Sequence, residues 1–244
     1  SSISRLKQEI MLKSRELGVD LAIQRMEAYR KNKRLLFFDM DSTLIDAECI
    51  DELGEAAGAG DEISEITEQA MEGDIDYEDS LVKRVQLLKD TELETAQEVI
   101  KNLPIMPGAK ELISYVKSLG YKTAMISSGF TLATEYIGKI LDIDYVVSNE
   151  LVIDNGCLTG EVRGPLTKQD SKEDVFEQIA QMNCVYPKDC IAVGDGANDI
   201  CMFKKAGYSI AFNSKPILRQ YANVVITRKD LRAIIPVIEA LNMG

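Results

Sequence analysis

Two acidic motifs in the sequence each follow an apolar run of the length expected for a buried strand. Leu35-Leu36-Phe37-Phe38 comes directly before the first pair of acids, and Ile191-Ala192-Val193-Gly194 before the second. An uninterrupted apolar run is typical of a strand buried on both faces of a parallel sheet. The acids that follow are Asp39, Asp41, Asp195 and Asp199. Because ligands bind beyond the carboxyl ends of such strands, we expect these side chains to meet in one crevice.

Four carboxylates in one crevice repel one another strongly unless a cation lies among them. Oxygen ligands alone suit a hard cation such as Mg²⁺, which keeps several waters and often bridges to a substrate phosphate. The two motifs together therefore predict a magnesium site for phosphoryl chemistry. Each motif taken alone has a simpler explanation, since Asp39 and Asp41 can close a turn after a strand and Asp195 and Asp199 can cap a helix.

Length and composition favour an ordinary globular protein. The 244 residues suffice for one large domain or for a domain with a smaller insertion, and 45% of them are hydrophobic. The net charge of -12 argues against a nucleic-acid partner, because phosphate backbones are bound by basic surfaces. No apolar run approaches the roughly 18 residues of a membrane span and no secretory signal is visible, which favours a cytoplasmic location without a membrane partner.

The cysteine and histidine contents narrow the chemistry. Five cysteines, an odd number without a C-x-x-C pair, indicate reduced thiols. The chain has no histidine, which excludes a Ser-His-Asp or Cys-His relay and a His-ligated zinc ion. A carboxylate nucleophile needs no such partner, since it is already ionised at pH 7.

The order of the hydrophobic patterns predicts an α/β fold with an insertion. Residues 1–33 carry a basic, near-helical pattern broken around Gly18, which favours a solvated helix packed on the main body over a membrane-surface or nucleic-acid-binding arm. Residues 47–103 have helical spacing throughout and no proline, which predicts a small helical insertion. Residues 34–46 and 104–244 are then expected to form a doubly wound, mostly parallel, Rossmann-like core.

Within residues 104–244 we expect alternating helices and strands with one exception. Residues 146–163 contain Asn155-Gly156 between two apolar stretches, a strong signal for a hairpin with a type I′ turn. Ser127-Ser128-Gly129-Phe130 is expected to open a helix after strand 123–126. The other expected elements are helices 108–119 and 171–182 and strands 190–194, 209–212 and 224–227.

The chemical motifs, taken in order, resemble those of the haloacid-dehalogenase-like phosphatases. They are D-M-D-S-T at 39–43, Ser127-Ser128-Gly129, Lys172 and G-D-G-A-N-D at 194–199, and the likeness runs from about Arg34 to the C-terminus. It implies the α/β core of this superfamily, with residues 47–103 as a cap that closes over the substrate. Within the superfamily the chain is similar to the branch that hydrolyses O-phosphoserine, which implies a small-molecule phosphoserine substrate and release of serine.

The resemblance also implies roles for the acids. Asp39 would attack phosphorus in line to give an aspartyl phosphate, and Asp41 would protonate the leaving hydroxyl and then activate water. Neighbouring negative charge would raise the pKa of Asp41, as this acid role requires. Mg²⁺ would be bound by the Asp39 carboxylate, the Asp41 main-chain carbonyl and Asp195, with Asp199 acting through the waters of the metal.

A second set of residues would bind the phosphate. Ser127 and the amides after it lie where a strand is expected to pass into a helix, a position that binds anions, although a simple helix cap would use the same residue. The family usually has glycine in place of Ser128. Lys172 lies in a first helical turn, where an anion such as phosphate would compensate its charge, and only the resemblance selects it over Lys168. Asn198 would add a side-chain donor.

Glu48 and Arg84, in the expected cap, would bind the amino-acid part of the substrate. An acid and a bidentate guanidinium complement its ammonium and carboxylate groups. Without the resemblance, an early-helix acid and a solvated arginine explain the two residues better. Met71 and Tyr77 would be apolar lid contacts, and Tyr77 replaces the more usual phenylalanine of the family.

Two other functions fit the same motifs. A related phosphomonoesterase or phosphotransferase would act on another small phosphate ester, and a sensor would bind a phosphorylated ligand without turnover. The presence of every acid needed for turnover favours an enzyme. A homodimer is compatible with the sequence, which does not decide the oligomeric state.

Overall fold

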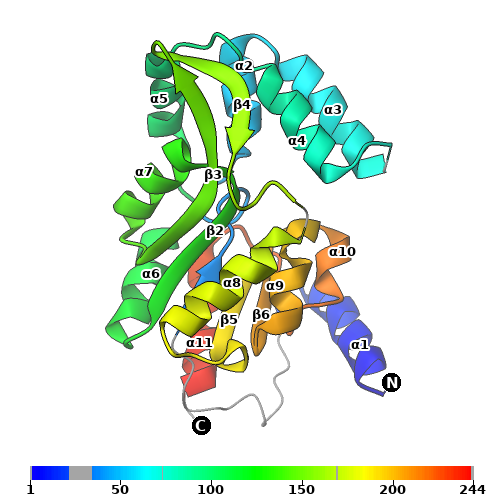
Figure 1. Ribbon diagram of the computed structural model, residues 1–244. Coiled ribbons are helices and arrows are strands. Elements are labelled where there is room, and N and C mark those ends of the chain that lie inside the picture. Colours follow the sequence, from blue (N-terminus) through cyan, green and yellow to red (C-terminus); the bar gives the residue numbers. More distant parts are fainter. Residues whose placement is uncertain (1, 22–34, 73, 169, 243–244) are drawn as a thin grey trace.

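The computed structural model describes residues 2–21, 35–72, 74–168 and 170–242 (Figure 1). Its centre is a seven-stranded sheet in the order β4-β3-β2-β1-β5-β6-β7, in which every neighbouring pair is parallel except β3 with β4. The strands are β1 (Leu35–Phe38), β2 (Lys122–Phe130), β3 (Tyr145–Asp154), β4 (Cys157–Arg163), β5 (Cys190–Gly194), β6 (Tyr208–Phe212) and β7 (Val224–Ile226). The predicted α/β, doubly wound, mostly parallel sheet is confirmed.

Helices cover both faces of this sheet. One face carries α6 (Ala109–Ser118), α7 (Thr131–Leu141) and α11 (Ile235–Asn242). The opposite face carries α8 (Ser171–Met182), α9 (Ile200–Lys205) and α10 (Pro216–Arg219). The predicted bounds of the helix at 171–182 and of the strand at 190–194 agree with α8 and β5.

Strand β1 is buried from both sides. Leu36 and Phe38 join the apolar cluster beneath α6, α7 and α11, whereas Leu35 and Phe37 join the cluster beneath α8, α9 and α10. The ring of Phe37 packs on that of Phe176 in α8 at a centroid distance of 4.2 Å. Burial of each such side chain contributes about 1.5–3 kcal/mol. The carboxyl end of β1 is therefore a rigid support for the residues that follow it.

Strands β2, β3 and β4 are added in turn on one side of β1, whereas β5, β6 and β7 are added on its other side, so β1 lies between β2 and β5. Phe38 pairs with Val193 in β5, and the amide of Asp39 donates to the carbonyl of Val193 at 3.1 Å. The loops after β1 and β5 leave the same edge of the sheet toward opposite faces. This is the topological switch point at which open α/β sheets bind their ligands.

A helical insertion, residues 47–103, follows β1 and lies at one end of the molecule, at the top of Figure 1. Its helices are α2 (Cys49–Ala57), α3 (Gly60–Glu72), α4 (Tyr77–Gln86) and α5 (Leu93–Asn102). The two segments that connect the insertion to the core pair with each other, since the amide of Asp46 donates to the carbonyl of Pro104 at 2.9 Å. The β3–β4 hairpin contacts it as well, because the amide of Leu93 donates to the carbonyl of Gly156 at 2.8 Å. That the insertion acts as a separate cap domain stays a prediction.

The hairpin at 146–163 has the predicted turn. Strands β3 and β4 pair in antiparallel register around Asn155 and Gly156. Both residues have positive φ, 49° and 81°, as a type I′ turn requires.

The expected helix opening at residues 127–130 is wrong. Ser127-Ser128-Gly129-Phe130 belongs to β2, and α7 begins only at Thr131. The register between β2 and β3 shifts between Ile126 and Phe130, so this segment keeps strand conformation while it leaves regular pairing. Two backbone groups of this segment bond to side chains instead, since the Ser128 carbonyl accepts from Nδ2 of Asn149 at 3.0 Å and the Gly129 amide donates to the Ser127 hydroxyl at 2.9 Å.

The N-terminal segment is described as far as residue 21. Helix α1 (Ser2–Leu17) ends next to Gly18, where the pattern was broken, and presents Leu12 and Leu17 to solvent. Asp20 accepts hydrogen bonds from the amide and hydroxyl of Thr227 at 3.1 and 2.8 Å. The rest of the predicted helical pattern, from residue 22 to residue 33, lies outside the described residues. Among the helices that are described, none has the length and apolar character of a membrane span.

We expect Asp144→Asn to destabilise the sheet between β2 and β3. Asp144 accepts hydrogen bonds from the amide and hydroxyl of Thr123 at 2.8 and 2.9 Å. Burial by itself raises the pKa of Asp144, but these hydrogen bonds and the charge of Lys117 lower it by more. Loss of the charged acceptor should reduce the free energy of unfolding by about 1.5–3 kcal/mol at pH 7, measured by urea unfolding.

The pH dependence of this effect follows from the lowered pKa. The carboxylate contributes stability above its unfolded pKa of about 3.9, and this contribution is lost as pH falls through the folded value. The difference between wild type and Asp144→Asn should therefore shrink below about pH 4. Glu68→Gln, at an exposed position in the interior of α3, should change the unfolding free energy by less than about 0.5 kcal/mol. A difference that persists unchanged at pH 3 would contradict the assignment.

Candidate active site

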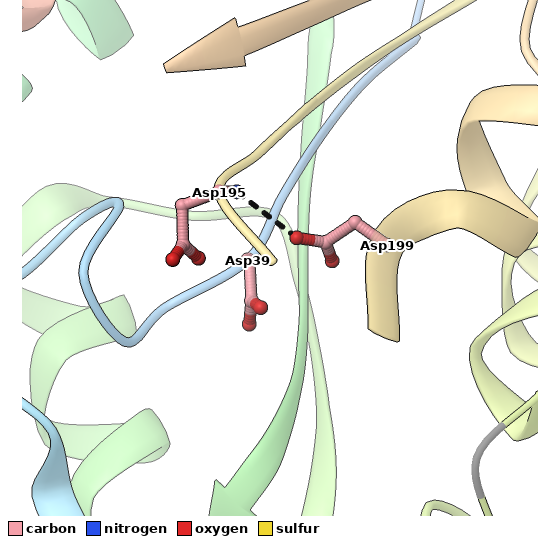
Figure 2. A group of neighbouring side chains, drawn as sticks. All are labelled: Asp39, Asp195 and Asp199. Carbon is pink, nitrogen blue, oxygen red and sulfur yellow. Dashed lines mark hydrogen bonds between the residues drawn. The ribbon is translucent and has the colours of Figure 1, made fainter. Parts of the chain in front are cut away.

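Three carboxylates meet at the switch point. Asp39 follows β1, while Asp195 and Asp199 follow β5, and one oxygen of each lies within 4.8 Å of the others. All three side chains are buried. Figure 2 shows Asp195 and Asp199 approaching Asp39 from two sides. Asp39 of the first motif thus lies together with Asp195 and Asp199 of the second, whereas Asp41, expected in the same crevice, is not in this cluster.

Backbone groups hold Asp199 in place. Its Oδ2 accepts hydrogen bonds from the amides of Asp195 and Gly196 at 3.0 and 3.2 Å, the first of which is dashed in Figure 2. These bonds cap the 3₁₀ turn η3 (Ala197–Asp199), so the helix-cap explanation of this acid is also true. A Cβ on Gly194 would overlap the Asp199 carboxylate, which explains the glycine that ends β5. The second carboxylate oxygen of Asp199, Oδ1, still faces the site.

Lys172 provides the positive charge inside the centre. Its ammonium lies 2.6 Å from Oδ2 of Asp39 and donates to Oδ1 of Asp199 at 2.9 Å. Burial by itself lowers the pKa of Lys172, but the carboxylates of Asp199 and Asp39 raise it by more, so the ammonium stays charged. These carboxylates already compensate the cation in the first turn of α8, a role that the sequence suggested for phosphate. Lys168, the competing lysine, is exposed.

One ammonium does not cancel the repulsion among three carboxylates. Burial raises the pKa of Asp195 to about 8, and the charges of Asp199 and Asp39 add to the rise. Burial and the charge of Asp39 likewise raise the pKa of Asp199 to about 6, against the opposing charge of Lys172. A hard divalent cation would favour the ionised forms, and this oxygen donor set fits Mg²⁺.

Asp41 lies apart from the three carboxylates. Its Oδ1 accepts a hydrogen bond from the amide of Cys49, the first residue of α2, at 2.8 Å, and its Oδ2 accepts one from the Ser127 hydroxyl at 3.3 Å. Burial raises the pKa of Asp41 well above its ordinary value, and the charges of Glu48 and Asp39 add to the rise. A carboxyl group in this environment can hold a proton, as a general acid must.

Of the predicted phosphate ligands, Lys172 and Asn198 contact Asp39, whereas Ser127 contacts Asp41. Ser127 is fully buried, and its hydroxyl accepts a hydrogen bond from the amide of Gly129 at 2.9 Å. Asn198 donates to Oδ2 of Asp39 at 3.3 Å. Ser128 does not have a positive φ, so the serine stands in this position without backbone strain. The backbone conformation at this position therefore does not require the glycine that is usual in the family.

Glu48 and Arg84 both belong to the helical insertion. Glu48 precedes α2 but does not cap it, and its carboxylate instead accepts a hydrogen bond from the Ser42 hydroxyl at 2.7 Å. Arg84 is half-buried in the last turn of α4, where its Nε donates to the carbonyl of Ser80 at 3.3 Å. Burial raises the pKa of Asp51 in α2 and of Tyr77 in α4, and the charge of Arg84 opposes both rises. The Met71 side chain lies outside the described residues.

Ser42 and Lys215 also lie at the site, although the sequence analysis gave neither a role and named Ser42 only as a member of the motif at 39–43. Ser42 holds Glu48 and has a positive φ of 52°, which leaves no mark in the sequence. The amide of Lys215, after β6, donates to the carbonyl of Asp195 at 2.9 Å, and its charge acts against the rise in the pKa of Asp195. Pairing of β5 with β6 brings Lys215 there, and no motif spacing reveals it.

The fold is a doubly wound sheet, and a buried cluster of carboxylates and one lysine lies at its switch point. This combination is typical of α/β enzymes that use carboxylates for catalysis. Residues 33–207 match the family model of the haloacid dehalogenase-like hydrolases. The chain belongs to the haloacid dehalogenase-like hydrolase family, and the resemblance seen in the sequence is confirmed.

Several relatives in this family are phosphoserine phosphatases. The one from Methanocaldococcus jannaschii is 45% identical over 86% of this chain and 99% of its own length. The one from Archaeoglobus fulgidus is 40% identical over 93% of this chain, which spans 66% of that relative's length. A solved phospho-aspartyl intermediate analogue of phosphoserine phosphatase superimposes with a TM-score of 0.81 at 45% identity, covering 85% of this chain and 99% of that one. A haloacid dehalogenase family hydrolase from Salmonella enterica gives 0.90 at 29% identity, covering 96% and 80%.

We expect Mg²⁺ to raise the melting temperature of the protein through this centre. A ligand that binds only the folded state stabilises it by about 2.7 kcal/mol at a hundred times its Kd, which corresponds to a rise of about 5–10 °C for a chain of this length. Asp195→Asn should abolish most of the rise, measured by calorimetry with Mg²⁺ and with chelator. Asp174→Asn, on an exposed position of α8, should respond to Mg²⁺ as the wild type does. An undiminished response of Asp195→Asn would exclude Asp195 as a metal ligand.

Proposed function

We propose that this protein is a Mg²⁺-dependent phosphatase that hydrolyses O-phospho-L-serine to L-serine and phosphate, the final step of a serine-forming route. The observation that carries the proposal is the buried Asp39, which Lys172 contacts at 2.6 Å and which lies within 4.8 Å of Asp195 and Asp199. The choice of substrate is supported by the relatives from Methanocaldococcus jannaschii and Archaeoglobus fulgidus, which are phosphoserine phosphatases.

Asp39 acts first, as the nucleophile. Its carboxylate oxygen attacks phosphorus opposite the ester oxygen, the bond from phosphorus to the serine oxygen breaks, and an aspartyl phosphate forms. Asp41 donates its proton to the departing oxygen, which leaves as the hydroxyl of serine. The raised pKa of Asp41 supports this role, because the group must be protonated before the step.

Asp41 then acts as a base. It takes a proton from a water molecule whose oxygen attacks the phosphorus of the aspartyl phosphate, and the bond to Asp39 breaks to release phosphate. Lys172, Ser127, Asn198 and the amide of Ser128 bind the phosphate oxygens through both steps. The Asp39 carboxylate, the Asp41 carbonyl and Asp195 would hold Mg²⁺, which supplies positive charge where the phosphoryl group gains negative charge.

The helical insertion selects the substrate. Glu48, oriented by Ser42, binds the ammonium group of phosphoserine, and Arg84 binds its carboxylate. Because the Asp41 carboxylate accepts the amide of Cys49 in α2, the general acid and the insertion that carries Glu48 are connected directly. Recognition of the amino acid and protonation of its hydroxyl thus occur in one connected structure.

Asp39→Asn should abolish the covalent phosphoenzyme. The amide oxygen is a far weaker nucleophile than the carboxylate, so no acid-stable label should appear after rapid quenching with ³²P-labelled phosphoserine. Asp61→Asn should be labelled as the wild type is. Turnover of Asp39→Asn at more than about a thousandth of the wild-type rate would exclude Asp39 as the nucleophile.

Arg84→Ala should impair phosphoserine far more than an aryl phosphate that lacks the amino-acid groups. Loss of a charge-assisted hydrogen bond of about 1.5–3 kcal/mol predicts a fall in kcat/KM for phosphoserine of about 10- to 150-fold. The value for p-nitrophenyl phosphate should change less than about threefold, since nothing in this substrate pairs with the guanidinium. Arg163→Ala, on the exposed hairpin strand β4, is the matched control and should leave both values unchanged. Equal losses for the two substrates would show that Arg84 does not bind the carboxylate.

The alternative functions give different results in one experiment. Phosphate release from a panel of phosphate esters, with Mg²⁺ and with chelator, should be greatest for phosphoserine. Preference for another ester, or transfer to an added alcohol, would favour a related phosphomonoesterase or phosphotransferase. Metal-dependent binding without release of phosphate would favour a sensor.

A further inference from the structure

Ser80, in helix α4 of the insertion, carries a buried hydroxyl that the rest of the described chain does not bind. The Ser80 side chain is fully buried, and its Oγ has no hydrogen-bond partner among the described residues. A hydroxyl in this state has given up its hydrogen bonds to water and has gained none in return. Because such groups are rare in folded proteins, the Ser80 hydroxyl indicates a partner that comes from outside the chain.

Arg84 lies one helical turn beyond Ser80 and folds back toward it. Its Nε donates to the backbone carbonyl of Ser80 at 3.3 Å, which places the guanidinium next to this serine. The two terminal nitrogens of the guanidinium remain as donors. Within the described part of the chain, Arg84 forms no ion pair with a carboxylate. A fully buried hydroxyl and a half-buried guanidinium thus lie side by side, and both lack an acceptor.

The two side chains share one face of α4. Successive residues of an α-helix are about 100° apart around its axis, so Ser80 lies about 40° from Arg84 and about 100° from Leu81. Leu81 and Val85 form the strip of α4 that is buried in the apolar cluster of the insertion and core. Arg84, by contrast, is only half-buried. Ser80 is therefore grouped with the arginine that faces accessible space rather than with the apolar strip.

We propose that Ser80 is a specificity-determining residue whose hydroxyl donates a hydrogen bond to the substrate carboxylate that Arg84 binds. A carboxylate has two oxygens and several lone pairs, so it can accept from the guanidinium and from the hydroxyl at the same time. The inference rests on the proposed function, because it names the carboxylate of phosphoserine as the missing acceptor. The backbone carbonyl of Ser80 orients Arg84, and the Ser80 side chain adds a donor to the same anion-binding group.

Ser80→Ala tests the hydroxyl by itself. The variant keeps the backbone carbonyl that holds Arg84, and alanine has the highest helix propensity. The matched pair of substrates is phosphoserine and O-phosphoethanolamine, which keeps the phosphate and the ammonium group and lacks only the carboxylate. The kcat/KM for phosphoserine should fall about 10-fold or more, the equivalent of one hydrogen bond to a charged group. The value for phosphoethanolamine should change less than about twofold.

Ser118→Ala is the matched control. Ser118 ends α6, is exposed, and donates from its hydroxyl to the carbonyl of Tyr115 at 2.6 Å. Its replacement should leave kcat/KM for both substrates unchanged.

The melting temperature of the ligand-free protein separates this role from a structural one. Removal of a buried hydroxyl without a partner relieves its desolvation cost, so Ser80→Ala should melt at or above the wild-type temperature in calorimetry. A hydroxyl that stabilised the fold through a partner inside the protein would give a variant that melts lower, and this result would overturn the proposal.

The substrate comparison also separates this proposal from the proposed function. If the wild type hydrolyses phosphoserine, and Ser80→Ala loses activity equally on both substrates or on neither, the role of Ser80 is overturned and the proposed function stands. A wild type that does not release phosphate from phosphoserine would overturn the proposed function itself.

Discussion

The structure depends on the electrostatic balance among Asp39, Asp195, Asp199 and Lys172. Three carboxylates and one ammonium, all buried, would leave excess negative charge in a low-dielectric site if every carboxylate were ionised. The high pKa of Asp195, about 8, expresses this excess. A divalent cation would relieve this excess, and a phosphoryl group could then approach without meeting a net anionic surface. The donor set therefore fits a cation and an anionic substrate bound together.

The sheet makes this balance possible. Strand β1 is packed on both faces and paired on both edges, so Asp39 cannot retreat from Asp195 to lower the repulsion. Asp199 is equally fixed, because its carboxylate accepts the amides of Asp195 and Gly196. A rigid scaffold thus holds the carboxylates close together, at a separation that suits a bound cation, although their mutual repulsion favours a larger one.

The helical insertion is held against the core at two places. The amide of Cys49 in α2 donates to the Asp41 carboxylate, and the amide of Leu93 in α5 donates to the carbonyl of Gly156 in the hairpin turn. In the proposed function the core residues would bind the phosphate group common to all phosphate esters, whereas Glu48 and Arg84, from the insertion, would bind the rest of the substrate. Contact between the two parts would then also exclude bulk water from the reaction.

The sequence by itself determined the apolar strands, the acids that follow them, the helical insertion and the hairpin turn, because these depend on local patterns of burial and backbone conformation. The lack of histidine likewise excluded a Ser-His-Asp or Cys-His relay, with which a carboxylate nucleophile is compatible. The residue patterns left Lys172 and Lys168 as alternatives, which only the resemblance separated, and the tertiary structure places Lys172 in the centre. The tertiary structure alone decided that residues 127–130 extend β2, that Ser42 holds Glu48 and that Lys215 lies beside Asp195. Such contacts join residues from separate elements, and only strand pairing and helix packing fix the distances between them.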